Sequence, residues 1–336
     1  MVNPGGDVAA KYLLSGALLV RFMVVGMAIW MCLPVVAAEP IAKQSFQEIW
    51  AYVMKDRQAA IQEGQPVTDL AFFAAGLSYR GSLIDLPQVE KSSGIKARRH
   101  LVLAEVENGA LLHFVLAPEF AVRDKLVADL VAAAADWDGV QIDFEEIAAY
   151  DAANFRQFLA LLKAGLGDKL LSVALPARKG TVDDAFAYAP IAALVDRVVV
   201  MAYDEHWSGS APGPIASLAW SESVARHALE TIGAEKLVMG LPLYGRVWAD
   251  RNPTGAYRFT SIDKLRQDQK AKQLRSAEGI PYFRFSSTIK YTAWFEDARS
   301  VGKRAAIYAG LGIPRIGFWR LGLEDPAIWK GLEVRE

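Results

Sequence analysis

The sequence predicts an α/β protein folded as one (β/α)8 TIM barrel with a small insertion between the seventh and eighth strands. Eight short stretches rich in apolar residues alternate with helical stretches, which is typical of parallel strands buried on both faces. About 300 residues follow the N-terminal segment, enough for one large domain. We therefore expect residues 39–336 to form the barrel, with the insertion at about 251–291.

The first 38 residues have the composition of a targeting segment. Lys11 and Arg21 precede an uncharged apolar run over 22–36, and the small residues that end at Ala38 suit a signal peptidase. We expect a signal peptide cleaved after Ala38, although the apolar stretch 12–36 is also long enough to remain as an N-terminal membrane anchor. Both alternatives predict an exported protein, periplasmic or extracellular.

Composition argues against several classes of partner. Cleavage after Ala38 would remove Asp7, Lys11 and Arg21 and leave 35 basic and 37 acidic side chains. The net charge would be −2, so we expect no nucleic acid partner. The only cysteine, Cys32, lies in the N-terminal segment, which excludes a disulfide framework and a thiol nucleophile. The four histidines fall on separate predicted elements, so we expect no metal and no cofactor. We expect a monomer that acts on a neutral polymer, because the net charge is close to zero.

The elements of the barrel can be placed by periodicity. Each expected strand is short and rich in apolar or aromatic residues, and the helices between them repeat with a period near 3.6. The expected strands are 49–54, 70–75, 101–106, one within 137–147, 170–176, 195–204, 236–244 and 316–321, and the clearest helices are 122–135, 151–166, 221–232 and 294–311.

Residues 251–291 are too many for one barrel connection. A polar helix near 261–279 and a strand-like stretch at 282–285 indicate a small subdomain, and an insertion after a barrel strand lies at the catalytic face. Its aromatic residues either bind sugar faces or pack inside the subdomain, the commoner fate of large aromatics. They are Tyr257, Tyr282 and Phe283.

The fourth strand carries an unusual row of polar side chains. Apolar residues alternate along 140–145 with Gln141, Asp143 and Glu145, which would face a buried interior where unpaired charge is costly. In a barrel these side chains point inward, and Glu145 lies nearest the active-site mouth. Asp143 lies roughly 6.6 Å away along the strand, close enough to share a proton that keeps a glutamic acid protonated as a general acid. The alternative is a solvated strand end that caps the next helix.

This stretch resembles the signature strand of family 18 glycoside hydrolases, D-G-x-D-x-D-x-E. Asp138, Gly139, Asp143 and Glu145 are in register with that pattern, and Gln141 stands where the first inner aspartate is usual. An amide at this position is common in the branch that includes spore-cortex and peptidoglycan N-acetylglucosaminidases, which this chain resembles most. The resemblance implies that Gln141 belongs to the substrate-binding set and that the usual relay between two aspartates is missing, because an amide cannot titrate.

Three other strand ends resemble motifs of the same family, at 201–204, 240–246 and 317–321. The resemblance implies that Tyr203 holds the substrate's acetamido group and that Asp204 binds the sugar near the cleaved bond. The remaining implied binding residues are Met201 on the inward face of its strand, Tyr244 facing the cleft and Trp319 as the floor of the subsite where the bond breaks. Each also has an ordinary interpretation as a rim tyrosine, a helix cap or a core residue.

The resemblance implies a retaining glycoside hydrolase that cleaves β-linked N-acetylglucosamine polysaccharide by substrate-assisted catalysis. Glu145 would serve as acid and base, and Asp143 would stabilise the acetamido group as it attacks the anomeric carbon. Peptidoglycan, a chitin-like polymer and an exopolysaccharide all remain open, because 203–217 also resembles barrels fused to exopolysaccharide synthases and deacetylases. Two alternatives are a non-catalytic carbohydrate-binding barrel, for instance one that binds chitin, and a scaffold of an exopolysaccharide export system.

Overall fold

The computed structural model describes residues 42–87, 96–251, 259–276 and 281–335. The expected N-terminal segment, with Cys32, and the insertion's Tyr257 lie outside the described residues. The compact unit Ile41–Glu336 contains every strand and helix of the described fold. Across the described ranges, no helix combines the length and the apolar character needed to cross a membrane.

Eight parallel strands close into a barrel, which confirms the predicted fold. Their hydrogen-bonded order is β2-β14-β9-β8-β7-β6-β5-β3, and pairing of β2 with β3 closes the circle. The short β4 (Leu83–Ile84) runs antiparallel to the end of β3. The barrel strands are β2 (Glu48–Met54), β3 (Asp69–Leu77), β5 (Arg98–Glu105), β6 (Gly139–Phe144), β7 (Leu170–Pro176), β8 (Arg197–Met201), β9 (Leu237–Pro242) and β14 (Arg315–Trp319).

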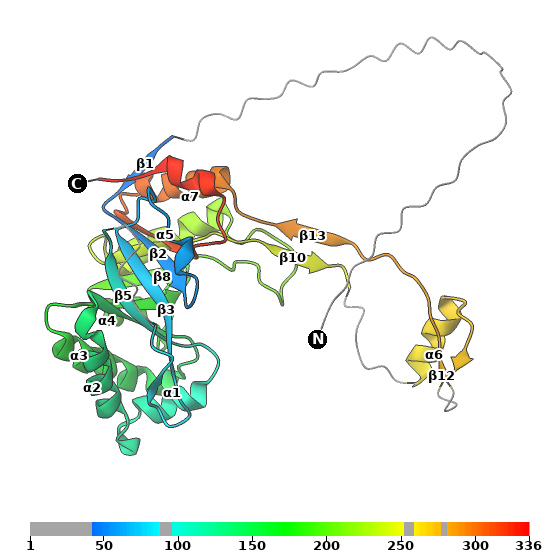
Figure 1. The fold of residues 1–336 in the computed structure, drawn as a ribbon, viewed down its shortest axis with the longest axis horizontal. Helices are drawn as coiled ribbons and strands as arrows, with labels where there is room; N and C mark the ends of the chain where they lie inside the picture. The colour runs from blue at the N-terminus through cyan, green and yellow to red at the C-terminus, as the bar shows by residue number, and fades with distance from the viewer. Residues whose placement is uncertain (1–41, 88–95, 252–258, 277–280, 336) are drawn as a thin grey trace, which may run out of the picture. The chain divides into compact units, whose positions relative to one another are not determined.

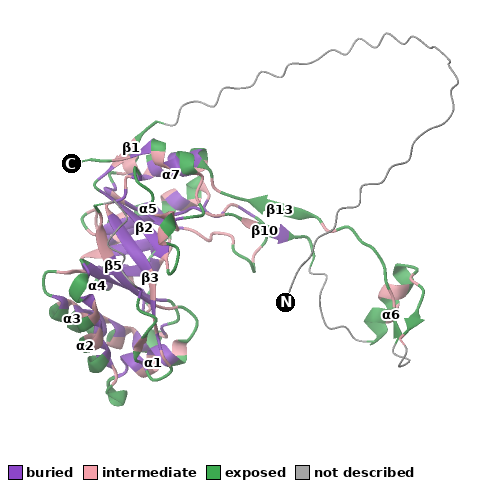
Figure 2. Ribbon diagram, viewed as in Figure 1, coloured by how far each residue is buried: buried purple, intermediate pink, exposed green. Residues whose placement is uncertain are grey.

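Helices cover the outer face of the barrel (Figure 1). Outward-facing strand residues pack against them: the ring of Phe144 lies 6.2 Å from Phe155 and 5.9 Å from Phe158, both on α3. The barrel strands are largely buried, and exposed residues gather on the outer faces of the helices (Figure 2). The helices are α1 (Gly109–Leu116), α2 (Arg123–Ala133), α3 (Ala152–Leu166), α4 (Tyr188–Ala192), α5 (Leu218–Ile232) and α7 (Ala298–Gly310), and β1 (Gln44–Phe46) pairs with β15 (Leu332–Val334).

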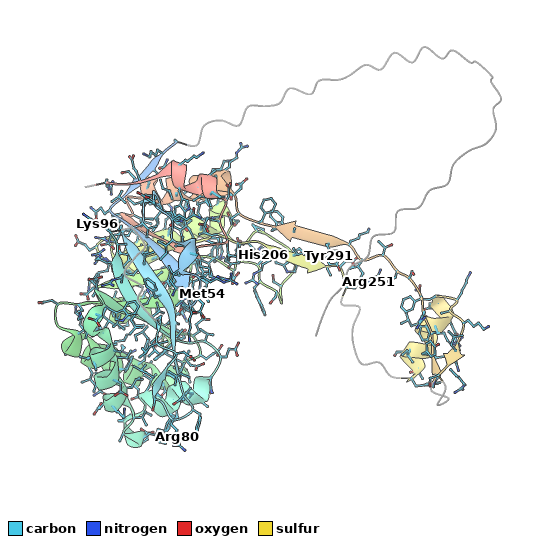
Figure 3. All side chains as sticks on the ribbon, in the orientation of Figure 1. Met54, Arg80, Lys96, His206, Arg251 and Tyr291 are labelled. Carbon is cyan, nitrogen blue, oxygen red and sulfur yellow. The ribbon has the colours of Figure 1, made fainter. Side chains whose placement is uncertain are left out.

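The alternate strand residues point into the barrel and fill it. Trp50, Tyr52, Val102, Val199 and Val238 belong to one buried cluster from four different strands, so the interior is a packed core. Met54, labelled in Figure 3, marks the carboxyl end of β2.

Gly240 on β9 makes room for a side chain of the site. A Cβ atom there would lie 2.6 Å from the carbonyl oxygen of Val200 and 3.1 Å from the ring of Tyr203. Only glycine therefore lets the Tyr203 ring approach β9 this closely.

A charged cluster closes the amino end of the barrel. Glu48 pairs with Arg197 at 2.6 Å, Arg98 at 3.0 Å and Arg315 at 3.2 Å, and it accepts a hydrogen bond from the Trp50 indole at 2.9 Å. Burial acts to raise the pKa of Glu48, but the hydrogen bonds from Arg197 and Trp50 and the arginine charges outweigh it and hold the pKa well below its usual range. Glu48 therefore stays ionised and pairs with three arginines at the amino end of the barrel.

The insertion lies between β9 and β14, as predicted, but its internal structure differs from the expectation. A two-stranded antiparallel ribbon of β10 (Arg246–Ala249) and β13 (Tyr291–Trp294) frames it, which the sequence did not indicate because the two strands are short and far apart in the chain. The expected helix is α6 (Phe259–Asp268), shorter than 261–279 at its carboxyl end. Of the stretch 282–285, only Tyr282 is in a strand, β12 (Pro281–Tyr282), which pairs with β11 (Leu274–Arg275).

The described aromatics of the insertion make local contacts. Arg284 stands 5.7 Å from the ring centre of Tyr282, and the rings of Phe283 and Phe285 stack at 5.8 Å. Tyr282 is 41% exposed and Phe283 is partly buried, so these local contacts are compatible with both interpretations.

Two further boundaries were wrong by a few residues. The helix expected at 294–311 begins at Ala298, because Trp294 pairs with Arg246 and the Asp297 side chain caps the helix by accepting from the Ser300 N–H at 2.7 Å. The strand expected at 195–204 ends at Met201, so the next three residues form the rim.

We predict that Glu48→Gln lowers the free energy of unfolding by about 3–5 kcal/mol, because three arginines would lose a buried partner. The depressed pKa of Glu48 implies stability that is present above its unfolded pKa of about 4.3 and is lost as the pH falls below that value. Denaturant unfolding of both proteins at pH 7 and at pH 4 measures this, with the exposed Glu235→Gln as the control. Equal stability of Glu48→Gln and the control at pH 7 would contradict it.

Candidate active site

With the exception of Gln141, the predicted site residues lie at the carboxyl ends of barrel strands. Asp143 is the last but one residue of β6, and Glu145 is the first residue after that strand. Met201 ends β8 two residues beyond the interior Val199, and Trp319 ends β14. The others follow strands β8 and β9 within three residues: Tyr203, Asp204 and Tyr244. One mouth of the barrel therefore gathers side chains from four strands.

Asp143 and Glu145 differ in their surroundings. Asp143 is 4% exposed, and its Oδ1 atom has no hydrogen-bond partner among the described residues. Burial, and secondly the charge of Glu145, raises the pKa of Asp143 to about 7. Glu145 lies exposed at the mouth, and its pKa is raised by partial burial in the rim and by the charges of Glu146 and Asp204. Both pKa values are raised, and the deeper burial of Asp143 favours the protonated form of that carboxyl. The expectation that Glu145 holds the proton as the general acid stays a prediction.

Gln141 lies one layer deeper in the barrel. It has no exposed surface, and its Nε2 donates to Ser172 Oγ at 3.2 Å. Its Oε1 atom is buried and has no hydrogen-bond partner among the described residues. Nearby, the pKa of Tyr52 is raised well above its usual value by burial and by the charge of Asp143. Gln141 therefore lies beneath Asp143 on the same strand and does not reach the open cleft.

Tyr203 stands between the carboxyl pair and the other tyrosines. Burial raises its pKa well above the usual value, and the neighbours that add to the rise are Tyr52, Asp143, Tyr244 and Glu145. Tyr203 is therefore a neutral hydroxyl that can donate a hydrogen bond at any physiological pH. Tyr52 was not singled out from the sequence, although alternation along 49–54 places it on the inward face together with Trp50.

Asp204 is held by the segment that follows β9. Its Oδ1 accepts from the Tyr244 hydroxyl at 2.5 Å and from Arg246 Nε at 3.0 Å, and Arg246 Nη2 reaches both oxygens at 2.7 and 2.8 Å. Asp204 itself has a left-handed backbone with φ of 59°. Arg246 was missed as a site residue, and the only sequence signal was its place at the end of the 240–246 motif.

An aromatic floor lies beside these groups. The Trp319 indole is partly exposed and packs edge-on against Tyr52 at 5.1 Å and Phe73 at 4.8 Å. Two aromatic neighbours fix the orientation of the indole, whose open surface suits the apolar face of a pyranose ring.

Comparison with known proteins places this arrangement in a family. The model of the glycosyl hydrolases family 18 matches residues 114–324, which include β6, β8, β9 and β14. The chain belongs to glycosyl hydrolase family 18. It is a glycosidase, as the resemblance of its strand ends indicated.

Several relatives share most of the barrel. The chain is 26% identical over 288 residues to the cortical fragment-lytic enzyme of Bacillus anthracis, which covers 79% of this chain and 67% of that one. It is 31% identical over 208 residues to YdhD of Bacillus subtilis, covering 57% of this chain and 49% of YdhD, so it spans about half the length of that relative.

Solved structures show the same fold. The spore cortex-lytic enzyme SleL of Bacillus cereus superposes with a TM-score of 0.68 at 22% identity, covering 88% of this chain and 76% of that one. A chitinase from Chromobacterium violaceum superposes with a TM-score of 0.65 at 24% identity, covering 85% and 97%. At these identities the likeness concerns the barrel alone.

We predict that kcat/KM falls above pH about 7 in a single-proton step. The raised pKa of Asp143 keeps one proton on the carboxyl pair up to that pH, and the pair loses it above, which leaves no acid for the leaving group. The pH dependence of kcat/KM on a soluble chitin oligomer measures this. A rate that stays level to pH about 9 would show that another group supplies the proton.

We predict that Gln141→Asp moves this alkaline limb to higher pH by about one unit while turnover at the optimum is preserved, because a second buried carboxylate beside Asp143 disfavours its ionisation. Gln141→Asn, which changes the side chain without adding a titratable group, is the matched control and should leave the limb in place. An unchanged profile in a fully active Gln141→Asp enzyme would mean that this position does not couple to the acid.

Proposed function

We propose that the chain is a retaining hydrolase of β-linked N-acetylglucosamine polysaccharide that uses substrate-assisted catalysis. The observation that supports this most directly is a buried carboxyl of raised pKa next to an exposed glutamate, with a neutral tyrosine hydroxyl beside both and an indole in the same mouth. This set can donate a proton, stabilise a developing cation and orient an acetamido group.

The reaction begins with proton transfer within the pair. A sugar that covers the mouth excludes water from Glu145 and raises its pKa further, while the acetamido N–H of the sugar favours ionised Asp143. The proton therefore moves from Asp143 to Glu145 when substrate binds. Each carboxyl is then in the state that its role requires.

Cleavage follows with atoms and charges in balance. Glu145 gives its proton to the glycosidic oxygen as the C–O bond breaks, and the acetamido carbonyl oxygen of the same sugar bonds to the anomeric carbon, forming an oxazolinium ion. Anionic Asp143 accepts the acetamido N–H and stabilises the positive charge. Water then attacks the anomeric carbon, gives a proton to Glu145 and reopens the ring with retained configuration.

The other residues orient the sugar. Tyr203 donates its hydroxyl to the acetamido carbonyl, and Trp319 supports the pyranose face. Met201 and Tyr244 shape the walls, and Gln141, held by Ser172, lies beneath Asp143. Asp204 contacts the sugar only through the part of its carboxylate that Arg246 and Tyr244 leave available.

Peptidoglycan is the polymer we favour, because relatives of this chain are named for cortical fragment or spore cortex lysis. A chitin-like polymer or an exopolysaccharide has the same acetamido chemistry at the cleaved sugar. Residues 1–38 are proposed to direct export to the periplasm or the cell exterior, as a signal peptide or a membrane anchor, and the barrel is proposed to act as a monomer.

We predict that Glu145→Gln lowers kcat by about 10²–10⁴-fold, the usual contribution of a general acid, because glutamine cannot deliver the proton. Glu146→Gln removes the neighbouring exposed carboxylate and is the matched control. Peptidoglycan, chitin oligomers and poly-β-1,6-N-acetylglucosamine are incubated with each protein, and the products are read by mass spectrometry. A wild-type protein that cleaves none of them would favour a carbohydrate-binding barrel or an export scaffold. A Glu145→Gln protein as active as the control would show that another group is the acid.

A further inference from the structure

Helices α5 and α7 pack against each other (Figure 1). A pocket lies between the beginnings of these two helices. Its volume is about 360 Å³, and none of its lining residues belongs to the active-site set. The side chains that matter here are Leu218, Trp294, Phe295, Arg299, Lys303 and Arg304.

The floor of this pocket is a buried guanidinium with unmet donors. Arg304 is 2% exposed, and its Nη2 donates to Glu296 at 3.0 and 3.2 Å and to the Ala216 carbonyl oxygen at 2.6 Å. Its Nε and Nη1 atoms are buried and have no acceptor among the described residues. A guanidinium carries five N–H donors and no acceptor, so the floor favours an incoming anion.

The rim adds two exposed cations. Arg299 and Lys303 stand one turn apart on α7, and within the described part of the chain neither forms an ion pair. The acidic residues nearby are already engaged: Glu296 binds Arg304 and Ser300 Oγ at 2.6 Å, and Asp297 caps α7. The start of α7 contributes a further partial positive charge.

One wall of the pocket is aromatic. Trp294 and Phe295 are 43% and 72% exposed, and Leu218 is also exposed. Exposed aromatics grouped at a pocket mark a binding surface, and a flat ring suits the face of a sugar. A cationic floor and rim beside an aromatic wall match a ring that carries a negative charge.

The pocket adjoins the backbone that carries the active site. Glu205, the residue after Asp204, accepts from Ser217 N at 2.6 Å and from Ser217 Oγ at 3.1 Å at the start of α5. Gly245, the residue after Tyr244, has room for no side chain, because a Cβ atom would lie 2.5 Å from Phe295 Cβ. The pocket and the rim of the active site are therefore connected through these two segments.

We propose that this pocket binds a carboxylate-bearing sugar unit of the same polysaccharide, outside the subsite where the bond breaks. The proposal rests on the proposed function, since it takes the ligand to be another part of the polymer that the active site cleaves. It makes the enzyme prefer acidic glycan strands to neutral ones such as chitin.

The test measures binding by titration calorimetry to the Glu145→Gln protein, which leaves the polymer intact. The probes are peptide-free peptidoglycan strands, in which alternate sugars carry a lactyl carboxylate, and the same strands after conversion of the carboxylates to methylamides. The binding variant adds Arg299→Gln and Lys303→Gln to the Glu145→Gln protein. The charge-matched control adds Lys43→Gln and Arg335→Gln, which remove two cations near the β1–β15 pair.

We expect acidic strands to bind about tenfold more tightly than amidated strands, equivalent to about 1.4 kcal/mol. The binding variant should lose most of that difference and the control should keep it, while Trp294→Ala should weaken both strand forms. Equal binding of the two forms to the Glu145→Gln protein, or a difference that survives in the binding variant, overturns the pocket proposal and leaves the hydrolase standing. If neither form binds and the wild-type protein cleaves neither, both proposals fail.

Discussion

The buried carboxyl of Asp143 is the constraint on which the rest of the site depends. A carboxylate inside a packed barrel loses most of its hydration, so it retains a proton to a pH at which an exposed aspartate is fully ionised. That retained proton is useful only because Glu145 stands just outside the strand, where substrate can change its environment. Water is kept away from the Asp143 carboxyl by the closed barrel, by the packed interior below it and by the tyrosines above it.

The two ends of the barrel shift the pKa of a buried acid in opposite directions. At the amino end, Glu48 has three arginines and an indole as partners, and its pKa is depressed. At the carboxyl end, Asp143 has an oxygen without a partner among the described residues, and its pKa is raised. Satisfied charge stabilises the fold, whereas an unsatisfied acid is costly for folding and remains available for chemistry.

The parts of this arrangement that depend on local periodicity were predictable. Alternation along 140–145 placed Asp143 and Glu145 on the inward side, and the strand order followed from apolar stretches separated by helices. The hairpin of β10 and β13 was not predictable, because its strands are four residues each and their pairing joins segments more than forty residues apart. The ion pair between Arg246 and Asp204 was also missed, because it depends on where the chain turns after β9. The hydrogen bond from Gln141 to Ser172 depends on the register of β6 against β7, and no spacing in the sequence reveals that register.

Arg246 changes what Asp204 can do. The Oδ1 atom of Asp204 accepts from a tyrosine hydroxyl and from two guanidinium nitrogens, and one of those nitrogens also binds Oδ2. The carboxylate therefore has little capacity left for a sugar hydroxyl. Its negative charge still raises the pKa of Glu145, and the ion pair with Arg246 fixes the position of that charge. Asp204 therefore acts on Glu145 through its charge at the mouth. Since Arg246 begins β10, the hairpin of the insertion supplies the residue that holds Asp204 in place.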